Sequence, residues 1–424
     1  MNYHQKKKTM NSRESERSEP NEINDLIEKQ ANIFVSIASY RDPETPKTVQ
    51  HLFKTAANPG RITVLINEQN QPSSKTTKQL QENDYEDVSV MNFPNSSRYA
   101  QQIRILQINS YEARGPVIAR AQIEEELYTP GEADFWLQID SHMAFVKHWD
   151  NVLIRQNKML PEPDKSILTT LPPDYNPGDR KSLPSLSLPN FIGFHDYNNI
   201  RHFPTQQRYQ FQNFPDVPRR SLFYAGCFAF SPASIIERVP YDKYAPYLFL
   251  GEEISMAARF FTNGYDLFSP SSSPVFHLTS RKYRPLFWEQ LHVKNAKTSP
   301  VVREERKLIE ANSVARIQNL IFYGKNPTEG GGIYGLGNER SLDDFQKFTG
   351  LNFLNKNASP RAKLGIEENA SDAEWIEKYN VRKSKWEYAL RNLKPIIPVD
   401  FKITSSYGSN KPSHKPAPVV RQLY

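Results

Sequence analysis

The feature that most constrains the fold is a strand, a helix and a second strand that follow one another near the start of the chain. Residues 32–42, NIFVSIASYRD, contain a short apolar run rich in β-branched side chains, Ile33, Phe34, Val35 and Ile37, as in a buried strand. Residues 43–60 place apolar side chains at helical spacing and end on Asn-Pro-Gly, and residues 61–69, RITVLINEQ, are apolar again. Such a unit predicts a right-handed crossover between parallel strands, and therefore an α/β protein.

Polar residues stand at the ends of these two predicted strands. Ser39, Tyr40 and Arg41 close the first strand, and Asn67 lies near the end of the second. In sheets of this kind, ligands bind at the carboxyl ends of the strands. We therefore expect these four side chains to lie close to a ligand.

A third apolar run, FWLQID, ends on Asp140 and is followed by Ser141 and His142. Side chains alternate along a strand, so Asp140 and His142 are expected on the same side, where they could share one cation. A carboxylate with an imidazole favours a transition metal such as Mn²⁺ over Mg²⁺. The alternative is a solvated turn in which Asp140 caps the next segment and His142 is incidental, because a motif this short often occurs by chance.

A third metal ligand is available in His277, which ends the apolar run PVFHL. At a strand exit it could lie beside the same edge of the sheet. A histidine in an apolar strand is, however, more often an ordinary core residue. From the residues alone, both interpretations stay open.

Two arginines belong to a further helix, expected over residues 112–128. Arg114 and Arg120 would point in nearly opposite directions on one helix, unless the helix begins at Pro116 and leaves Arg114 in the preceding loop. Either arginine could bind phosphate through forked hydrogen bonds. Each could equally form a surface ion pair with the acidic run at residues 124–126.

Later segments predict two more helices and a long irregular region. One helix opens at the acidic pair Glu252 and Glu253, which the helix dipole favours at that end, and the other covers residues 300–325. Residues 161–220 are rich in Pro, Asn and Ser, which predicts long loops around a few strands and suits an acceptor pocket.

Composition limits the classes of partner. The chain has 424 residues with 54 Lys and Arg against 47 Asp and Glu, and the folded region shows no nucleic-acid-binding module, so no nucleic acid is expected. No stretch approaches the roughly 18 apolar residues of a membrane span. The single cysteine, Cys227, excludes an intramolecular disulfide.

Several of these segments together resemble a known family. They include EARGPVIARAQIEEELYTPGEADFWLQIDSHMAF, LFLGEEISMAARFFTNGYDLFSP and SPVFHLTSR. Over about residues 32 to 350, the chain resembles the polypeptide N-acetylglucosaminyltransferases of glycosyltransferase family sixty, typified by enzymes that modify hydroxyproline on a cytoplasmic ubiquitin-ligase subunit. It is more distantly similar to polypeptide N-acetylgalactosaminyltransferases, which share a G-x-x-x-A-R helix, a D-x-H motif and a later metal-binding histidine.

The resemblance implies a fold and a reaction. The fold would be a GT-A (Rossmann-like) nucleotide-diphospho-sugar transferase fold, α/β with a mixed central sheet, over residues 31–325, followed by a helical C-terminal extension over residues 326–404. A disordered polar lead, residues 1–30, and a disordered tail, residues 405–424, would flank it. The reaction would be the retaining transfer of GlcNAc from UDP-GlcNAc to hydroxyproline, Ser or Thr of a protein acceptor, in the cytoplasm of its own cell or of a host cell.

The resemblance also implies roles for individual residues. Mn²⁺ or another divalent metal would be held by Asp140, His142 and His277. The nucleotide-sugar donor would be contacted by Ser39, Tyr40, Arg41, Arg114, Arg120, Asp140 and Arg281. Glu252 and Glu253 are the candidate catalytic residues, one of which would contact the donor sugar near the acceptor, and the catalytic base is left unassigned. Two alternatives are a glycan acceptor with the same donor chemistry and a non-catalytic carbohydrate-binding relative.

Overall fold

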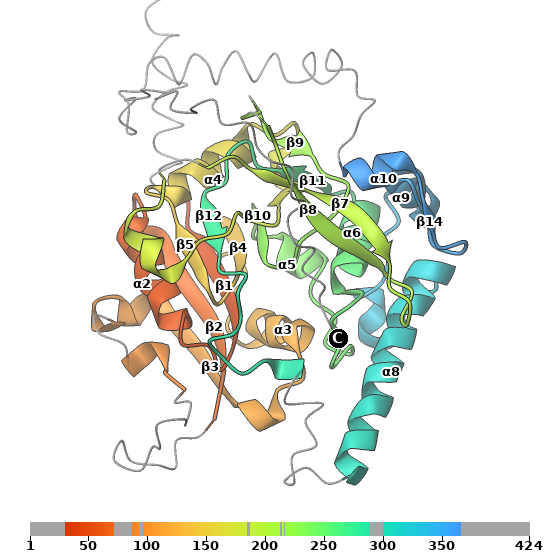
Figure 1. Ribbon diagram of the computed structural model, residues 1–424, viewed down its shortest axis with the longest axis horizontal. Coiled ribbons are helices and arrows are strands. Elements are labelled where there is room, and N and C mark those ends of the chain that lie inside the picture. Colours follow the sequence, from red (N-terminus) through yellow and green to blue (C-terminus); the bar gives the residue numbers. More distant parts are fainter. Residues whose placement is uncertain are drawn as a thin grey trace, which may run out of the picture.

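The computed structural model describes residues 30–71, 87–92, 96–184, 187–212, 214–215, 217–288 and 300–365 (Figure 1). The predicted disordered tail lies outside these residues, as does the predicted lead apart from its last residue, Gln30. Within the described residues, no helix combines the length and the apolar character needed to cross a membrane.

A mixed eight-stranded sheet forms the centre of the molecule, in the order β3-β2-β1-β4-β10-β6-β11-β9. Strands β1, β2, β3 and β4 run parallel, whereas β10 is antiparallel to both of its neighbours, and β9 is antiparallel to β11. The strand bounds are β1 Ile33–Tyr40, β2 Ile62–Asn70, β3 Ile103–Asn109, β4 Phe135–Asp140, β6 Ser166–Thr169, β9 Arg219–Arg220, β10 Phe228–Pro232 and β11 Asp266–Ser269. The predicted α/β class with a mixed central sheet is confirmed.

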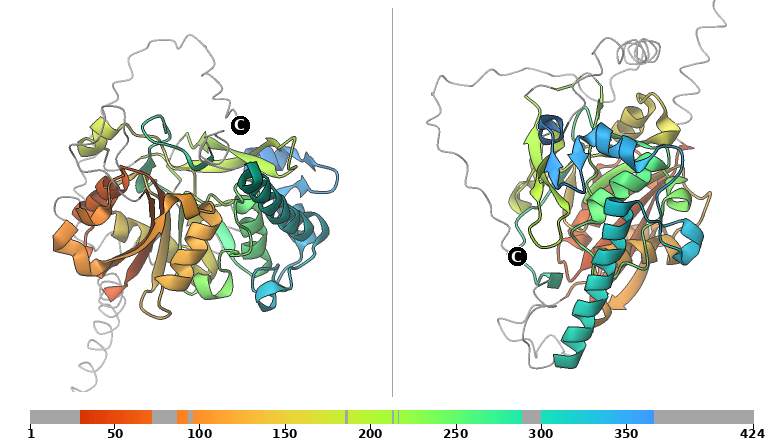
Figure 2. Two further views of the ribbon diagram at one scale, coloured as in Figure 1. Left: turned by 90° about the horizontal axis from the view of Figure 1, so that it is seen from below. Right: turned by 90° about the vertical axis from the view of Figure 1, so that its right-hand side faces the viewer.

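Helices cover both faces of this sheet, and Figure 2 shows α2 and α8 on opposite sides of it. The helix bounds are α2 Thr45–Thr55, α3 Pro116–Glu126, α4 Trp149–Lys158, α5 Ile235–Arg238, α6 Glu252–Thr262, α8 Pro300–Tyr323, α9 Leu342–Thr349 and α10 Pro360–Leu364. Short 3₁₀ turns lie at Pro59–Arg61, Val90–Asn92, Ser96–Gln102, Ser110–Glu112, Pro163–Lys165, Pro177–Lys181 and Glu329–Gly332.

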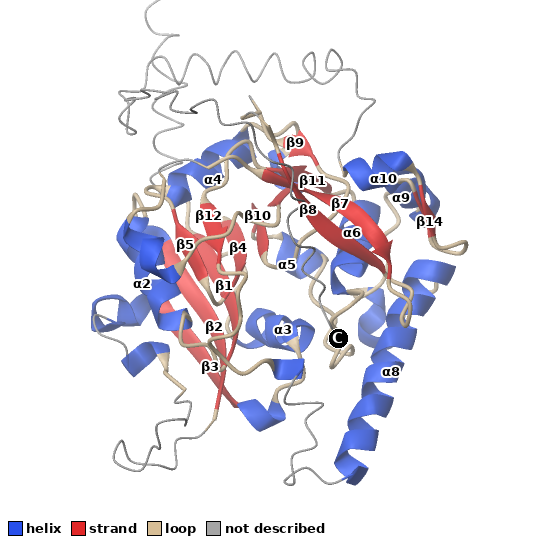
Figure 3. Ribbon diagram, viewed as in Figure 1, coloured by secondary structure: helices blue, strands red, loops and turns tan. Residues whose placement is uncertain are grey.

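Three strand pairs stand apart from the central sheet, and Figure 3 shows the hairpin of β7 and β8 as a separate ribbon. Their bounds are β5 Met143–Phe145 with β12 Val275–His277, β7 Asn190–Tyr197 with β8 Pro204–Gln210, and β13 Leu351–Asn352 with β14 Asn357–Ala358. The region predicted as long loops around a few strands thus contains β6, β7, β8 and β9.

Strand alternation divides the apolar side chains between two cores. On β4, Leu137 and Ile139 join the core beneath α2 and α4, whereas Trp136 joins the core beneath α3, α6 and α8. The same alternation holds on β1, where Val35 faces the first core and Phe34 the second. Burial of both faces explains why these strands read as nearly continuous apolar runs.

The helix that carries Arg120 begins at Pro116, so the broader prediction of residues 112–128 is wrong at its start and the alternative start at Pro116 is confirmed. Gly115 precedes it with φ 95°, a left-handed backbone conformation that residues with a side chain rarely adopt. The turn leaves Arg114 exposed in the loop and directs Arg120 into the interior.

Residues 326–365 contribute side chains to the core beneath α3, α6 and α8. Phe345 and Phe348 of α9 pack against Phe261 of α6, with ring centroids 5.5 and 5.3 Å apart. The remainder of the predicted extension lies outside the described residues, so its boundaries stay a prediction.

One turn after Arg120, α3 buries a carboxyl group. Glu124 accepts a hydrogen bond from the backbone N–H of Tyr241 at 2.7 Å. Burial raises the pKa of Glu124 to about 8. This carboxyl group therefore keeps its proton in the folded protein at pH values where the unfolded chain has lost it.

Leu137→Ala is expected to lower the free energy of unfolding by about 2–5 kcal/mol, because Leu137 is fully buried at the centre of the sheet and its loss leaves a cavity. Leu308→Ala is the matched control, since Leu308 is 64% exposed on α8, and its effect should stay within about 0.5 kcal/mol. Urea unfolding measures both, and equal costs would contradict the assignment of β4 to the core.

Glu124→Gln is expected to remove a pH dependence of stability. The pKa of Glu124 is raised on folding from 4.5 to about 8, so between these values the folded state binds more protons than the unfolded state. The wild-type free energy of unfolding should therefore fall as pH rises through this window, by at most about 1.4 kcal/mol per pH unit, and the variant should lose this slope. Urea unfolding at pH 5, 6, 7 and 8 measures the difference, with the exposed Glu126→Gln as control.

Candidate metal centre

Asp140, His142 and His277 meet beyond the carboxyl end of β4 and form the candidate metal triad. Nε2 of His277 lies 3.0 Å from Nε2 of His142 and 3.3 Å from Oδ2 of Asp140, and the third separation, between His142 Nε2 and Asp140 Oδ2, is 3.9 Å. Both imidazoles are buried, and the Asp140 side chain is 19% exposed. Three potential ligand atoms thus converge, and the carboxylate among them is partly exposed.

The pairing of β5 with β12 brings these residues together. Asp140 is the last residue of β4, and the chain turns through Ser141 and His142 directly into β5. Antiparallel pairing sets His277 opposite Met143, and the N–H of Leu278 donates to the carbonyl of His142 at 3.1 Å. The predicted convergence of the D-x-H motif with the later histidine therefore occurs.

The spacing and chemistry of the triad fit a divalent cation. A cation about 2.0–2.2 Å from each ligand keeps neighbouring ligand atoms about 3–3.6 Å apart, and two of the three separations, 3.0 and 3.3 Å, lie in this range. Two imidazoles and one carboxylate form a ligand set used by divalent transition metals, and they leave further coordination positions for another molecule. Within the described residues, this is the group of acids and imidazoles close enough to hold a metal ion.

A buried carboxylate stands behind His142. Oδ2 of Asp42 lies 2.8 Å from Nδ1 of His142 and accepts a hydrogen bond from the Ser141 hydroxyl at 2.6 Å. Arg284 approaches the same oxygen at 3.2 Å. Burial alone would raise the pKa of the Asp42 carboxyl, but the bond to His142 and the charge of Arg284 hold it well below its usual range, whereas burial lowers the pKa of His142.

Arg120 holds the other side of the triad. Its guanidinium lies 3.3 Å from Oδ1 of Asp140, so the second oxygen of that carboxylate faces the two imidazoles. It also donates to the carbonyl of Gly226 at 2.9 Å and pairs with the buried Glu252. Although burial opposes ionisation of Asp140, the neighbouring His277, His142 and Arg120 hold its pKa well below the usual range. Arg120 is thus engaged by protein carboxylates rather than free in solvent.

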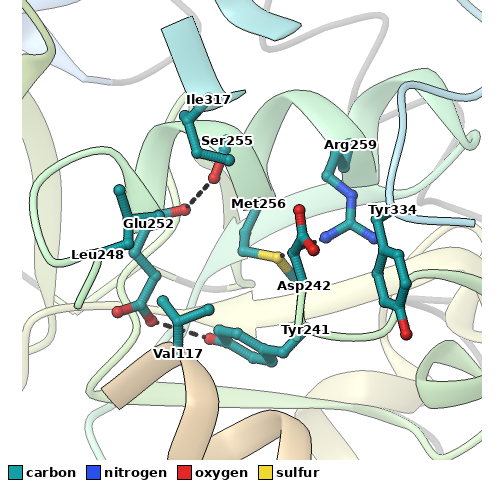
Figure 4. A pocket seen from close by; sticks show the side chains of 10 residues that line it. All are labelled: Val117, Tyr241, Asp242, Leu248, Glu252, Ser255, Met256, Arg259, Ile317 and Tyr334. Carbon is teal, nitrogen blue, oxygen red and sulfur yellow. Dashed lines mark hydrogen bonds between the residues drawn. The ribbon is translucent and has the colours of Figure 1, made fainter. Parts of the chain in front are cut away.

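The two acids at the start of α6 have different surroundings. Glu252 accepts from the Tyr241 hydroxyl at 3.1 Å and lies on the wall of a small internal cavity beside Val117 (Figure 4). Glu253 is half-buried and accepts the N–H of Gly226 at 3.1 Å. Burial and the nearby Glu252 raise the pKa of Glu253 to about 7. Glu252 is therefore enclosed by protein, whereas Glu253 keeps partial access to solvent.

The other residues predicted to contact the donor differ in their exposure to solvent. Ser39 is buried, and its hydroxyl lies 2.7 Å from that of Thr45, while Arg41 is buried against Asp87 at 3.0 Å. Tyr40 is half-buried and Arg114 exposed.

Arg281 lies nearer the triad, 4.0 Å from Oδ2 of Asp140, with its side chain 38% exposed. Of the predicted arginines, Arg114 and Arg281 are therefore the ones whose side chains reach solvent.

Sequence reasoning missed Asp42. It directly follows Ser39, Tyr40 and Arg41, at the strand end where polar residues were expected to approach a ligand. An acid at that position was a usable signal. Its partner His142 could not be identified from spacing, because 100 positions separate the two residues.

Comparison with known proteins identifies one family. A family model described as Glycosyltransferase (GlcNAc) matches residues 32–355. Among curated proteins, none matches the chain. A crystal structure of GalNAc-T7 with UDP, GalNAc and Mn²⁺ is similar with a TM-score of 0.42 and 11% identity, over 86% of this chain and 58% of that one. The matched family region contains the whole central sheet and the candidate metal triad.

Arg120→Gln is expected to lower the free energy of unfolding by about 3–5 kcal/mol, because it leaves Glu252 buried without its cation. Adding Glu252→Gln should cost less than the sum of the single changes, with a coupling energy of about 1–3 kcal/mol. Urea unfolding of the four proteins measures the cycle. The same cycle on the exposed pair Lys243 and Glu125 should give at most about 1 kcal/mol, and additive costs at Arg120 and Glu252 would contradict a coupled pair.

Proposed function

Because the chain belongs to the glycosyltransferase (GlcNAc) family, we propose that it is a metal-dependent, retaining GT-A enzyme that moves GlcNAc from UDP-GlcNAc to a hydroxyl group of a protein. The observation that carries the proposal is the candidate metal triad at the carboxyl end of β4 in a chain of this family. The acceptor hydroxyl would belong to hydroxyproline, Ser or Thr. We place the reaction in the cytoplasm, of the protein's own cell or of a host cell.

The triad would hold Mn²⁺ or a similar ion through Asp140 Oδ2 and the Nε2 atoms of His142 and His277. A divalent ion bound there supplies positive charge that stabilises a leaving diphosphate. When both imidazoles are neutral, the three residues together carry one negative charge. A divalent cation bound to them would therefore leave the site with a net positive charge, which would attract the donor phosphates. Burial, which lowers the pKa of His142, favours the neutral ligand form of that imidazole.

Two arginines are suited to the donor phosphates. Arg281 follows the triad and lies near Asp140, and Arg114 precedes α3 with an exposed side chain. A guanidinium offers forked hydrogen bonds that match phosphate oxygens. Three of the predicted donor contacts are already bonded to protein groups: Arg120, Arg41 and Ser39. They would affect donor binding indirectly, by positioning the residues to which they are bonded. Tyr40, half-buried at the end of β1, would contact the donor directly.

Glu253 is better placed than Glu252 to act on the donor sugar or the acceptor. The carboxylate of Glu252 is paired with Arg120 and bonded to Tyr241, which uses its hydrogen-bonding capacity inside the protein. Glu253 spends one oxygen on the N–H of Gly226 and is partly exposed. A pKa of about 7 would allow this group to accept or donate a proton near neutral pH.

Asp140→Asn is expected to reduce UDP release from UDP-GlcNAc by at least about 100-fold, because it removes the anionic ligand of the cation. Wild-type protein with Mn²⁺ and no acceptor should release UDP slowly, and chelator should abolish this release. Asp343→Asn, on the exposed start of α9, is the control and should match wild type. Full release in chelator, or no binding of any UDP-sugar, would exclude the proposed metal-dependent reaction.

An acceptor panel then distinguishes the remaining alternatives. Transfer to peptides with hydroxyproline, Ser or Thr supports the protein acceptor. Transfer only to oligosaccharides would replace it with a glycan acceptor, and donor binding without any turnover would indicate a non-catalytic carbohydrate-binding relative.

A further inference from the structure

Asp42 joins three separate parts of the chain at one buried carboxylate. It follows β1, and its side chain is 0% exposed. Through Oδ2 it contacts His142 and Ser141 beyond β4, and Arg284 in the segment beyond β12. Its other oxygen accepts the N–H of Glu44 at 3.0 Å, which fixes the carboxylate at the start of α2.

The contact with His142 determines which imidazole nitrogen carries the proton. An ionised carboxylate can only accept hydrogen bonds, so Nδ1 of His142, 2.8 Å from Asp42, must be the donor. Nε2 then presents its lone pair toward His277 and Asp140, at 3.0 and 3.9 Å. This tautomer is the one that can ligate a cation at the centre of the triad.

Through Arg284, Asp42 also contacts the segment that follows His277. Arg284 also donates to the carbonyl of Tyr40 at 2.9 Å. A few residues later, Phe287 packs edge-on against the ring of Tyr40, with centroids 5.3 Å apart. The segment is thus attached to the end of β1 at Tyr40 as well as at Asp42.

We propose that Asp42 is a positioning residue of the metal centre, which fixes the tautomer and direction of His142 and ties the segment after His277 to the same ligand through Arg284. This inference rests on the proposed function, because the cation at the triad belongs to it. Hydrogen-bonded carboxylates behind ligating histidines generally raise metal affinity 10- to 100-fold over variants that lack them. The role is distinct from ligation, since Asp42 faces the side of the imidazole away from the triad.

Asp42→Asn tests this role through metal affinity. The variant is expected to bind Mn²⁺ about 10- to 100-fold more weakly in calorimetric titration, because the neutral amide holds the Nδ1–H tautomer less strongly. Asp150→Asn is the matched control. Asp150 is also 0% exposed and paired with an arginine, Arg61, but it bonds the turn after α2 at Ala57 and Asn58. It should lose stability while keeping wild-type Mn²⁺ affinity.

The outcomes separate this inference from the proposed function. Equal Mn²⁺ affinity in wild type and folded Asp42→Asn overturns the positioning role and leaves the function standing, whereas no Mn²⁺ binding by wild type overturns both. If Asp42→Asn does not fold, a two-bond ¹H–¹⁵N correlation NMR spectrum of the wild-type protein shows which nitrogen of His142 carries the proton. The spectrum of His142→Gln assigns the signal to this residue. A proton on Nδ1 of His142 supports the role, and a proton on Nε2 alone contradicts it.

Discussion

The site depends on the balance of charge at one buried edge of the sheet. Asp42 and Asp140 stay ionised away from bulk water because each carboxylate has fixed donors, His142 and Ser141 for the first and Arg120 for the second. An unpaired buried carboxylate would instead take up a proton. Since a neutral acid is a poor metal ligand, these partners are a condition for any cation to bind. The layers of helix and sheet serve to hold the partners at these distances.

The guanidinium of Arg120 links the candidate metal triad to the buried core. Arg120 reaches Asp140 at the solvent side and Glu252 on the interior side, and it lies over the ring of Tyr241. The candidate metal ligand Asp140 is thus connected to α3 and α6 through one planar group. Lysine, with a single nitrogen, offers no equivalent pair of directions. The position of the ligand is therefore set by helix packing as much as by the strand that carries it.

Much of this architecture could be predicted from the sequence. The sequence predicted the βαβ unit, the α/β class and the helix that begins at Glu252. These predictions were possible because both faces of the sheet are buried, so that apolar runs mark the strands. The approach of His277 to the D-x-H motif was expected from strand exits and from the family resemblance. The role of Asp42 and the enclosure of Glu252 were not readable. Each depends on contacts over 100 positions or more, as between Asp42 and His142 or between Arg120 and Glu252, and local periodicity carries no information about such pairs.

The pairing of β5 with β12 has a consequence for how the protein matures. His277 reaches the D-x-H motif across 135 positions, so a growing chain carries two ligands long before it carries the third. The closing ladder is only three residues on each side, and its second strand, β12, follows all strands of the central sheet in the chain. A cation at the candidate metal triad would therefore be bound with all three ligands only by a chain that has been synthesised and folded beyond β12.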